Sequence, residues 1–105
     1  MVEVVMRDEL KQGLADGSIA LFDVREASEF AAGHIPGATS LPLSRFDVKA
    51  LPPEGGKRIV FSCRSGHRTL QALEMSRLSG RKDACAHYAG SMNDWIAAGE
   101  KVEIS

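Results

Sequence analysis

This sequence of 105 residues has little cysteine, almost no net charge and no long apolar run. Its two cysteines, Cys63 and Cys85, are too few for a disulfide scaffold and too far apart for a Cys-x-x-Cys pair. A net charge of -1 gives no support to a general role in nucleic-acid binding. No segment approaches the roughly 20 apolar residues that span a bilayer, and residues 1–10 lack the apolar stretch of a secretory signal. We therefore expect a protein of the reducing cytoplasm that does not enter a membrane.

Length and apolar pattern predict one α/β domain that covers residues 1–105. A hydrophobic content of 44% and a charged content of 26% are ordinary for a globular protein with a single core. Apolar runs typical of strands alternate with stretches typical of helices, which indicates a parallel sheet with helices on both faces. The predicted strands are 2–6, 19–24, 39–43, 58–62 and 84–88, and the predicted helices are 7–15, 26–32, 44–51, 69–78 and a last one that begins after Ser91.

Single residues refine the expected place of three of these elements. Pro42 lies inside the third predicted strand, and because proline cannot donate to a sheet, this strand is expected at the edge. Leu70, Leu73 and Leu78 are expected on one broad face of their helix. Ser91 is expected to cap the last helix, since the acid Asp94 follows three residues later.

Cys63 lies directly after a predicted buried strand and directly before a predicted helix. Free N–H groups at the start of that helix, its dipole and the cations Arg64 and Arg68 would stabilise a thiolate and hold a small anion beside it. Gly66 is expected to give the loop the unusual dihedral angles that let its N–H groups converge. Open parallel sheets bind ligands at the carboxyl ends of their strands, so the position of Cys63 favours a reactive site.

A structural role is the alternative for Cys63, because free cysteines are usually buried and behave as small apolar groups. The surrounding sequence argues against it, since a core cysteine needs no glycine and two arginines within five residues. The stretch 63–82 holds five basic residues against the single acid Glu74, which favours an anionic substrate. For Arg77, Arg81 and Lys82, however, a solvated helix face explains the charge equally well.

Polar residues outside this loop receive mostly structural interpretations. Asp23 closes an earlier strand, and it is expected either to orient a loop arginine or to cap the next helix. Arg25 and Glu29 are four residues apart and are expected to form an ion pair at the start of that helix. His34 is expected to be a hydrogen-bonded turn residue.

Three segments of the chain stand out together. They are Asp23-Val24-Arg25 followed by Glu29-Phe30, then Gly33-His34-Ile35-Pro36-Gly37-Ala38, and then Cys63-Arg64-Ser65-Gly66-His67-Arg68. In this order and spacing they resemble the characteristic segments of the rhodanese family of sulfurtransferases, and the match covers nearly all of the chain. The resemblance implies a three-layer α/β/α fold with a five-stranded parallel sheet. It also implies a catalytic Cys63 and a binding loop of Arg64, Ser65, Gly66, His67 and Arg68, with Asp23 in support.

The activity implied by the resemblance is transfer of a sulfane sulfur without a metal or an organic cofactor. Cys63 would take the outer sulfur of a small anionic donor such as thiosulfate and become a persulfide, and sulfite would leave. Cyanide in the test tube, or a thiol or a thioredoxin-like reductant in the cell, would then accept the sulfur. The alternative from another class is a non-catalytic rhodanese-like module that binds a partner or senses sulfur.

Two other cysteine-based sites fit the spacing less well. A Cys-x5-Arg phosphatase loop would need arginine at the position of Thr69, whereas Arg68 closes a loop one residue shorter, which suits a sulfur atom better than a phosphate. The four cysteines and histidines that could be imagined around a metal lack the usual zinc spacing. They are Cys63, His67, Cys85 and His87.

The chain departs from the family pattern in two places. Gly90-Ser91 stands where many relatives have Gly-Gly, and Glu100-Lys101 replaces a proline-containing end. Both lie far from the cysteine loop in sequence, so they are expected to affect local backbone geometry and C-terminal packing more than catalysis.

Overall fold

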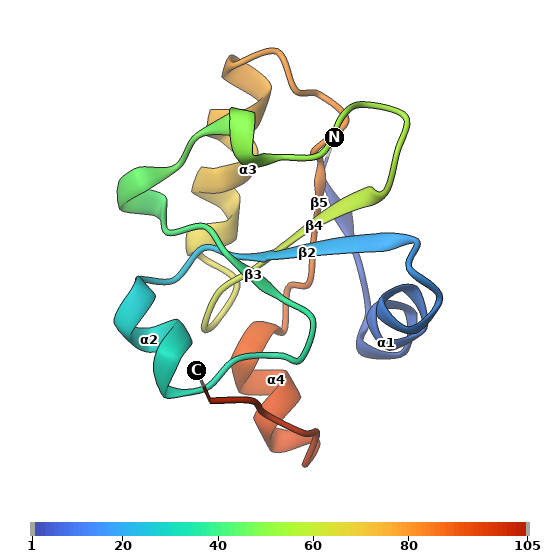
Figure 1. Ribbon diagram of the computed structural model, residues 1–105, viewed down its shortest axis with the longest axis vertical. Helices are drawn as coiled ribbons and strands as arrows, with labels where there is room; N and C mark the ends of the chain where they lie inside the picture. Colours follow the sequence, from blue (N-terminus) through green and yellow to red (C-terminus); the bar gives the residue numbers. More distant parts are fainter. Residues whose placement is uncertain (1, 105) are drawn as a thin grey trace.

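The computed structural model describes residues 2–104 and contains a five-stranded sheet with helices packed around it (Figure 1). The strands are β1 (Glu3–Val4), β2 (Ile19–Asp23), β3 (Thr39–Ser40), β4 (Arg58–Ser62) and β5 (Ala86–His87). The helices are α1 (Arg7–Asp16), α2 (Ala27–Ala32), α3 (Arg68–Leu78) and α4 (Ser91–Ala97), with 3-10 turns η1 (Leu43–Arg45) and η2 (Val48–Ala50). The strand order is β1-β5-β4-β2-β3, and every neighbouring pair is parallel.

The centre of the sheet is the pair β2 and β4, which run side by side from Ile19 opposite Arg58 to Asp23 opposite Ser62. Four of the five residues in each strand are buried, because helices cover both faces of the sheet. Continuous burial explains why these two segments read as unbroken apolar runs in the sequence. Both strands end in a polar residue at the same carboxyl edge.

Two apolar cores lie on opposite faces of the sheet, which confirms the predicted three-layer α/β/α architecture. On one face, Leu10 of α1 and Trp95 of α4 pack against Leu21 and Val60. On the other face, Leu73 of α3 packs in the core cluster that contains Phe61. Alternate residues of β4 therefore face different cores, and Cys63 falls on the α3 side.

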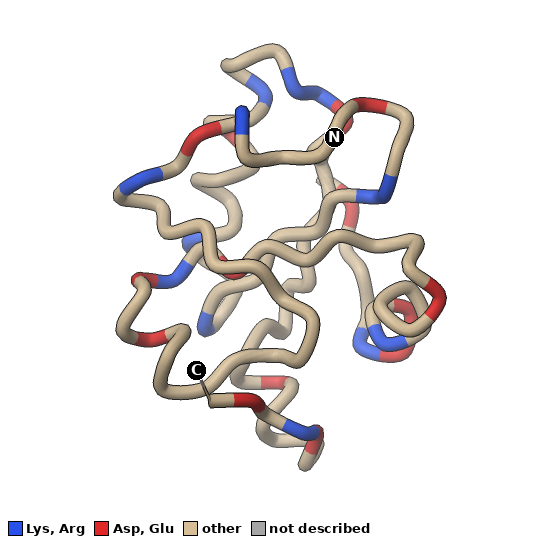
Figure 2. The backbone as a smooth tube through the Cα atoms, in the orientation of Figure 1, with Lys and Arg blue, Asp and Glu red and all other residues tan. Residues whose placement is uncertain are grey.

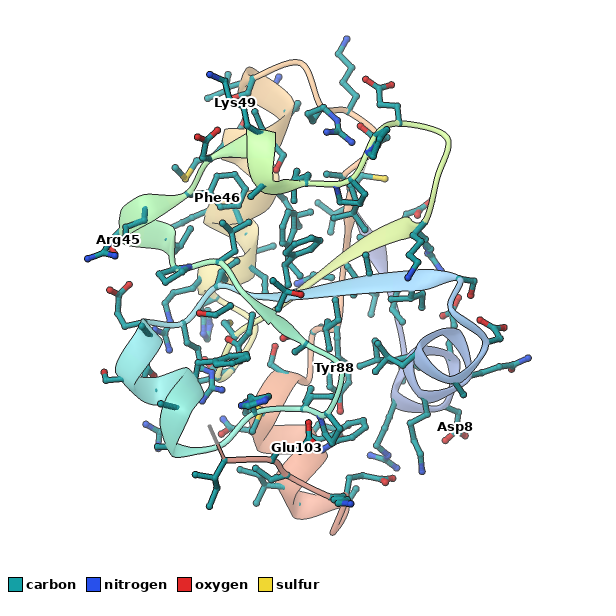
Figure 3. All side chains as sticks on the ribbon, viewed as in Figure 1. Asp8, Arg45, Phe46, Lys49, Tyr88 and Glu103 are labelled. Atoms are coloured by element: carbon teal, nitrogen blue, oxygen red, sulfur yellow. The ribbon has the colours of Figure 1, made fainter. Side chains whose placement is uncertain are left out.

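The edge position of β3 is confirmed, since this two-residue strand pairs only with β2 among the described residues. The segment 44–51, by contrast, is two 3-10 turns rather than the predicted helix. Phe46 ends the first turn, and Asp47 caps the start of the second, where its carboxylate accepts a hydrogen bond from the N–H of Lys49 at 2.9 Å. Phe46, labelled in Figure 3, packs edge-on against Phe61 with ring centroids 5.8 Å apart.

The predicted leucine face of α3 is wrong. Its buried residues are Thr69, Ala72, Leu73 and Ser76, whereas Leu70 and Leu78 are 48% and 71% exposed. At about 100° per residue, Leu78 points almost opposite to the centre of the buried face. Small residues on that face let the helix lie close to the sheet.

Charge is spread around the molecule rather than gathered on one face. Basic and acidic positions are interspersed along the described part of the chain (Figure 2). Between residues 2 and 104, no helix is both long enough and apolar enough to cross a membrane.

Candidate active site

Cys63 follows the last residue of β4, and α3 begins five residues later at Arg68. β4 lies between β5 and β2, so the loop 63–68 leaves the carboxyl edge of the sheet at its middle strand (Figure 1). Cys63 is only 1% exposed, and its side chain belongs to the apolar core that contains Phe61 and Ala72. The loop therefore holds a thiol at the boundary between an apolar core and the start of a helix.

The Cys63 sulfur is surrounded by backbone N–H groups. The N–H of Gly66 donates to Sγ at 3.1 Å. Burial alone would raise the pKa of the Cys63 thiol, but the N–H groups of Thr69, Gly66, Ser65 and Arg68 outweigh burial and hold this pKa below its usual value. The loop thus favours the thiolate, which is the nucleophilic form of cysteine.

Gly66 is required by the shape of this loop. Its φ is +92°, a backbone conformation that L side chains rarely adopt. A Cβ atom at this position would lie 2.3 Å from the carbonyl oxygen of Ala89, which is backbone and cannot move aside easily. The expectation that Gly66 lets the N–H groups converge is therefore supported by both its dihedral angle and its close neighbour.

The start of α4 holds Cys63 and Arg64 by their backbone groups. The N–H of Met92 donates to the carbonyl of Cys63 at 3.1 Å, and the N–H of Asn93 donates to the carbonyl of Arg64 at 3.0 Å. The hydroxyl of Ser91 accepts a hydrogen bond from the N–H of Cys63 at 3.0 Å. A helix that is distant in sequence therefore fixes the backbone that carries the sulfur.

Two expectations about Ser91 are corrected by these contacts. The N-cap of α4 is Gly90, and Ser91 makes no capping hydrogen bond with its side chain, because its hydroxyl donates to the carbonyl of Tyr88 at 2.7 Å and accepts from Cys63. Gly90-Ser91, which departs from the Gly-Gly of many relatives, was expected to be remote from the cysteine loop, but Ser91 is in contact with it. Ser91 has a φ of +52°, which explains why glycine suits this position.

Thr69 and His87 support the loop through hydrogen bonds of their side chains. The Thr69 hydroxyl lies 2.8 Å from the carbonyl oxygen of Gly66 and 2.7 Å from Nδ1 of His87. A hydroxyl has one proton, so when Thr69 donates to Gly66, Nδ1 of His87 must carry a proton and donate to Thr69. Burial lowers the pKa of His87, which favours the neutral ring in this arrangement.

The two arginines of the loop are in different surroundings. Arg68 forms an ion pair with Glu29 of α2, with Nη1 and Oε1 2.7 Å apart. Arg64 is exposed and has no ion-pair partner among residues 2–104. The charge available to an incoming anion is therefore mainly that of Arg64.

The expected pair between Arg25 and Glu29 is wrong, because each residue has another partner. Arg25 is buried and donates to both carboxylate oxygens of Asp23 and to the carbonyl of Gly33. Asp23 therefore neither orients a loop arginine nor caps α2, whose capping box is made by Glu26 and Glu29. Asp23 is 1% exposed, so its buried carboxylate is matched by the buried guanidinium beside it.

The remaining predicted site residues lie on the exposed side of the loop. The hydroxyl of Ser65 and Nδ1 of His67 are 3.0 Å apart, and both side chains are exposed. His34 is hydrogen-bonded as expected, since its Nδ1 lies 2.9 Å from the carbonyl oxygen of Phe30, but it lies in a β-bridge with Glu103 rather than in a turn. The structure thus brings Cys63 and the five residues 64–68 together and places Asp23 with Arg25.

Contacts with Ser91, Thr69, His87 and Glu29 were missed by the sequence analysis. Three of these contacts join residues that lie 18 to 39 positions apart in the sequence: Ser91 with Cys63, Glu29 with Arg68, and His87 with Thr69. The bond from Thr69 to Gly66 is local. Only Ser91 gave a signal in the sequence, as a departure from a glycine pair. Among the described residues, no group of three or more histidines, cysteines and acids could hold a metal ion.

Fold and loop together define a class of protein: an α/β domain that presents a cysteine thiol within a ring of N–H groups at the carboxyl edge of a parallel sheet. A rhodanese-like domain model matches residues 6–98. The chain belongs to this rhodanese-like family.

Several curated relatives of the chain are named sulfurtransferases. It is 37% identical over 102 residues to a thiosulfate:glutathione sulfurtransferase of Homo sapiens, with 84% of this chain and 88% of the relative covered. It is 33% identical over 106 residues to a protein of the same name from Saccharomyces cerevisiae, with 88% and 76% covered. The solved human single-domain sulfurtransferase superposes with a TM-score of 0.76 at 34% identity, over 92% of this chain and 97% of that one. These relatives support a transferase of the rhodanese type.

Proposed function

We propose that this protein transfers a sulfane sulfur through a persulfide on Cys63. The observation that carries the proposal is the ring of N–H groups around the Cys63 sulfur, with the Gly66 N–H at 3.1 Å. Such a ring stabilises negative charge on the thiolate before the reaction and on the persulfide after it. Relatives named as sulfurtransferases support the same reaction type.

In the first half-reaction, the Cys63 thiolate attacks the outer sulfur of an anionic donor such as thiosulfate. A bond forms between Sγ and that sulfur, the sulfur–sulfur bond of the donor breaks, and its electron pair leaves with sulfite. The protein then holds a Cys63 persulfide, which is an anion at neutral pH. No proton, metal or external oxidant is needed to balance this step.

Donor binding is assigned to the exposed side of the loop. Arg64 is the main contact for a dianionic donor, because its guanidinium is exposed and has no acidic partner among the described residues. Ser65 and His67 supply further polar contacts, and Gly66 and Arg68 supply backbone N–H groups. The Arg68 side chain contributes less, since Glu29 already neutralises most of its charge.

In the second half-reaction, an acceptor thiolate attacks the terminal sulfur of the persulfide. The bond between Sγ and that sulfur breaks, and Cys63 returns to the thiolate. The names of two relatives favour glutathione as the acceptor, and a thioredoxin-like reductant would react by the same chemistry. We place this reaction in the cytoplasm, where thiols are kept reduced.

Intact mass tests the proposal most directly. Reduced protein treated with thiosulfate should gain the mass of one sulfur atom, and Cys63→Ser protein should gain none. Cyanide should discharge the adduct as thiocyanate, and glutathione should discharge it as glutathione persulfide. A folded wild-type protein that gains no sulfur from thiosulfate or polysulfide would contradict the proposal and favour a non-catalytic binding or sensing module.

A further inference from the structure

Ser91 is buried beside Cys63 in a conformation that is unfavourable for serine. Its exposed fraction is 0%, and it is the one residue other than glycine with a positive φ between residues 2 and 104. A strained backbone persists where the surrounding structure gains from it. The contacts of the Ser91 hydroxyl show where that gain lies.

The Ser91 hydroxyl joins three groups of the site. Its oxygen accepts the N–H of Cys63 at 3.0 Å, its proton goes to the carbonyl of Tyr88 at 2.7 Å, and the oxygen lies 3.9 Å from the Cys63 sulfur. Cys63 is 1% exposed, so its N–H would otherwise be cut off from water and left without a partner. The hydroxyl thus links the end of β4 to the residue that follows β5.

We propose that Ser91 is a positioning residue, whose hydroxyl fixes the Cys63 backbone so that the sulfur meets the N–H groups of the loop. The Met92 N–H holds the carbonyl of Cys63 and the Ser91 oxygen holds its N–H, so both backbone groups of Cys63 are tied to the start of α4. With the backbone fixed on both sides, the Sγ atom stays within 3.1 Å of the Gly66 N–H. Ser91 itself touches no donor or acceptor in this account.

Removal of the hydroxyl should therefore change the sulfur and not only the stability of the fold. Without an oxygen at this place, the Cys63 N–H must turn toward another acceptor, and the sulfur moves out of line with the loop N–H groups. The thiolate then loses part of its stabilisation. This inference rests on the proposed function for its meaning, but its main test, alkylation of the Cys63 thiol, needs no sulfur transfer.

The test is the pH dependence of Cys63 alkylation by iodoacetamide in the full chain, with Cys85→Ser as background so that one thiol reacts. Ser91→Gly removes the hydroxyl and relieves the strained φ, and Ser91→Ala removes the hydroxyl but keeps the strain. Both should raise the alkylation midpoint by about 0.5 to 1 pH unit, and the thiolate fraction below the midpoint falls by about three- to tenfold. The donor KM should change little compared with kcat, because the donor contacts are intact.

Ser76→Ala is the matched control. Ser76 is also 0% exposed, and its hydroxyl donates to the carbonyl of Ala72 at 2.8 Å within α3. It should lower thermal stability and leave the alkylation midpoint in place. An unchanged midpoint in folded Ser91→Gly would overturn the proposal, as would loss of the fold in both Ser91 variants, which would show a purely structural role. A wild-type protein that takes up no sulfur would refute the proposed function and leave this measurement valid.

Discussion

Arg68, at the end of the cysteine loop, and Glu29 of α2 form an ion pair with two contacts. Nη1 of Arg68 lies 2.7 Å from Oε1 of Glu29, and Nη2 lies 3.1 Å from Oε2. The pair joins the first residue of α3 to the first turn of α2, 39 positions away in sequence. One of the two cations that the sequence offers to a substrate is thereby matched by an acid of the same chain.

Glu29→Gln should strengthen the binding of anionic donors. Gln keeps the oxygen that accepts the Glu26 N–H in the capping box, but it leaves the charge of Arg68 unbalanced. We expect the KM for thiosulfate to fall by about two- to fivefold at low ionic strength, and the difference to shrink in high salt. Glu26→Gln is the control, because Glu26 contacts Ser44 and no loop arginine. A thiosulfate KM that rises in Glu29→Gln would mean that the pair holds Arg68 in its binding position.

The same pair should make stability depend on pH. The hydrogen bond from Arg68 lowers the pKa of Glu29 from 4.5 to about 2. Because the folded pKa is depressed, this stabilisation is present above about pH 4.5 and is lost as the pH falls toward 2. Both side chains are about one-third exposed, so we expect the ion pair to contribute about 1 kcal/mol to the free energy of unfolding after screening by solvent. Urea unfolding of wild type and Glu29→Gln at pH 6 and pH 3 should show a difference that narrows at pH 3; a constant difference would argue against this ion pair.

Gly66→Ala should damage both the fold and the reaction. Alanine meets the carbonyl oxygen of Ala89 and must also adopt a φ of +92°. We expect a loss of about 3 kcal/mol in the free energy of unfolding, with at least a tenfold loss of sulfur transfer in protein that still folds. Gly80→Ala is the matched control, since Gly80 has a φ of +87° and nothing within 4 Å of the added Cβ. Gly80→Ala should lower the free energy of unfolding by about 1 kcal/mol and leave sulfur transfer intact. Equal losses in both variants would show that strain, and not the contact with Ala89, is responsible.

Cys85 should take no part in the reaction. It precedes β5, whose register places Ala86 beside Val60, so Cys85 lies near Ile59 at the opposite end of β4 from Cys63. Ile59 and Cys63 are four positions apart along an extended strand, which is about 13 Å and well beyond the reach of a disulfide. Burial and the nearby Glu3 raise the pKa of Cys85, which disfavours its thiolate. Cys85→Ser should take up and release sulfur at wild-type rates; an internal disulfide seen by mass after mild oxidation of the wild type would refute this geometry.

Local sequence patterns predicted the elements of this fold well where burial is uniform. β2 and β4 are covered on both faces, so their apolar runs leave little choice of structure, and the place of Cys63 follows from the end of β4. Prediction failed where the outcome depends on partners distant in sequence. Glu29 pairs with Arg68 rather than with its helix neighbour Arg25, because Arg25 is drawn to a buried acid two residues before it.

The α3 leucines show a second kind of failure. Helical spacing identifies residues that share a face, but the face that packs is chosen by the space above the sheet. Here Ala72 and Ser76 fit that space, and Leu70 and Leu78 remain exposed. Ser91 could not be understood from its neighbours either, since its hydroxyl serves a residue 28 positions away.

The short helix α2 has a consequence for the dynamics of the loop. None of its six residues is fully buried, so few apolar contacts hold it to the sheet, and segments of this kind open more readily than the core. Opening of α2 would carry Glu29 away while β4, α3 and the sulfur stay in place. Each opening of this peripheral helix would therefore free the charge of Arg68 and make the potential at the loop more positive.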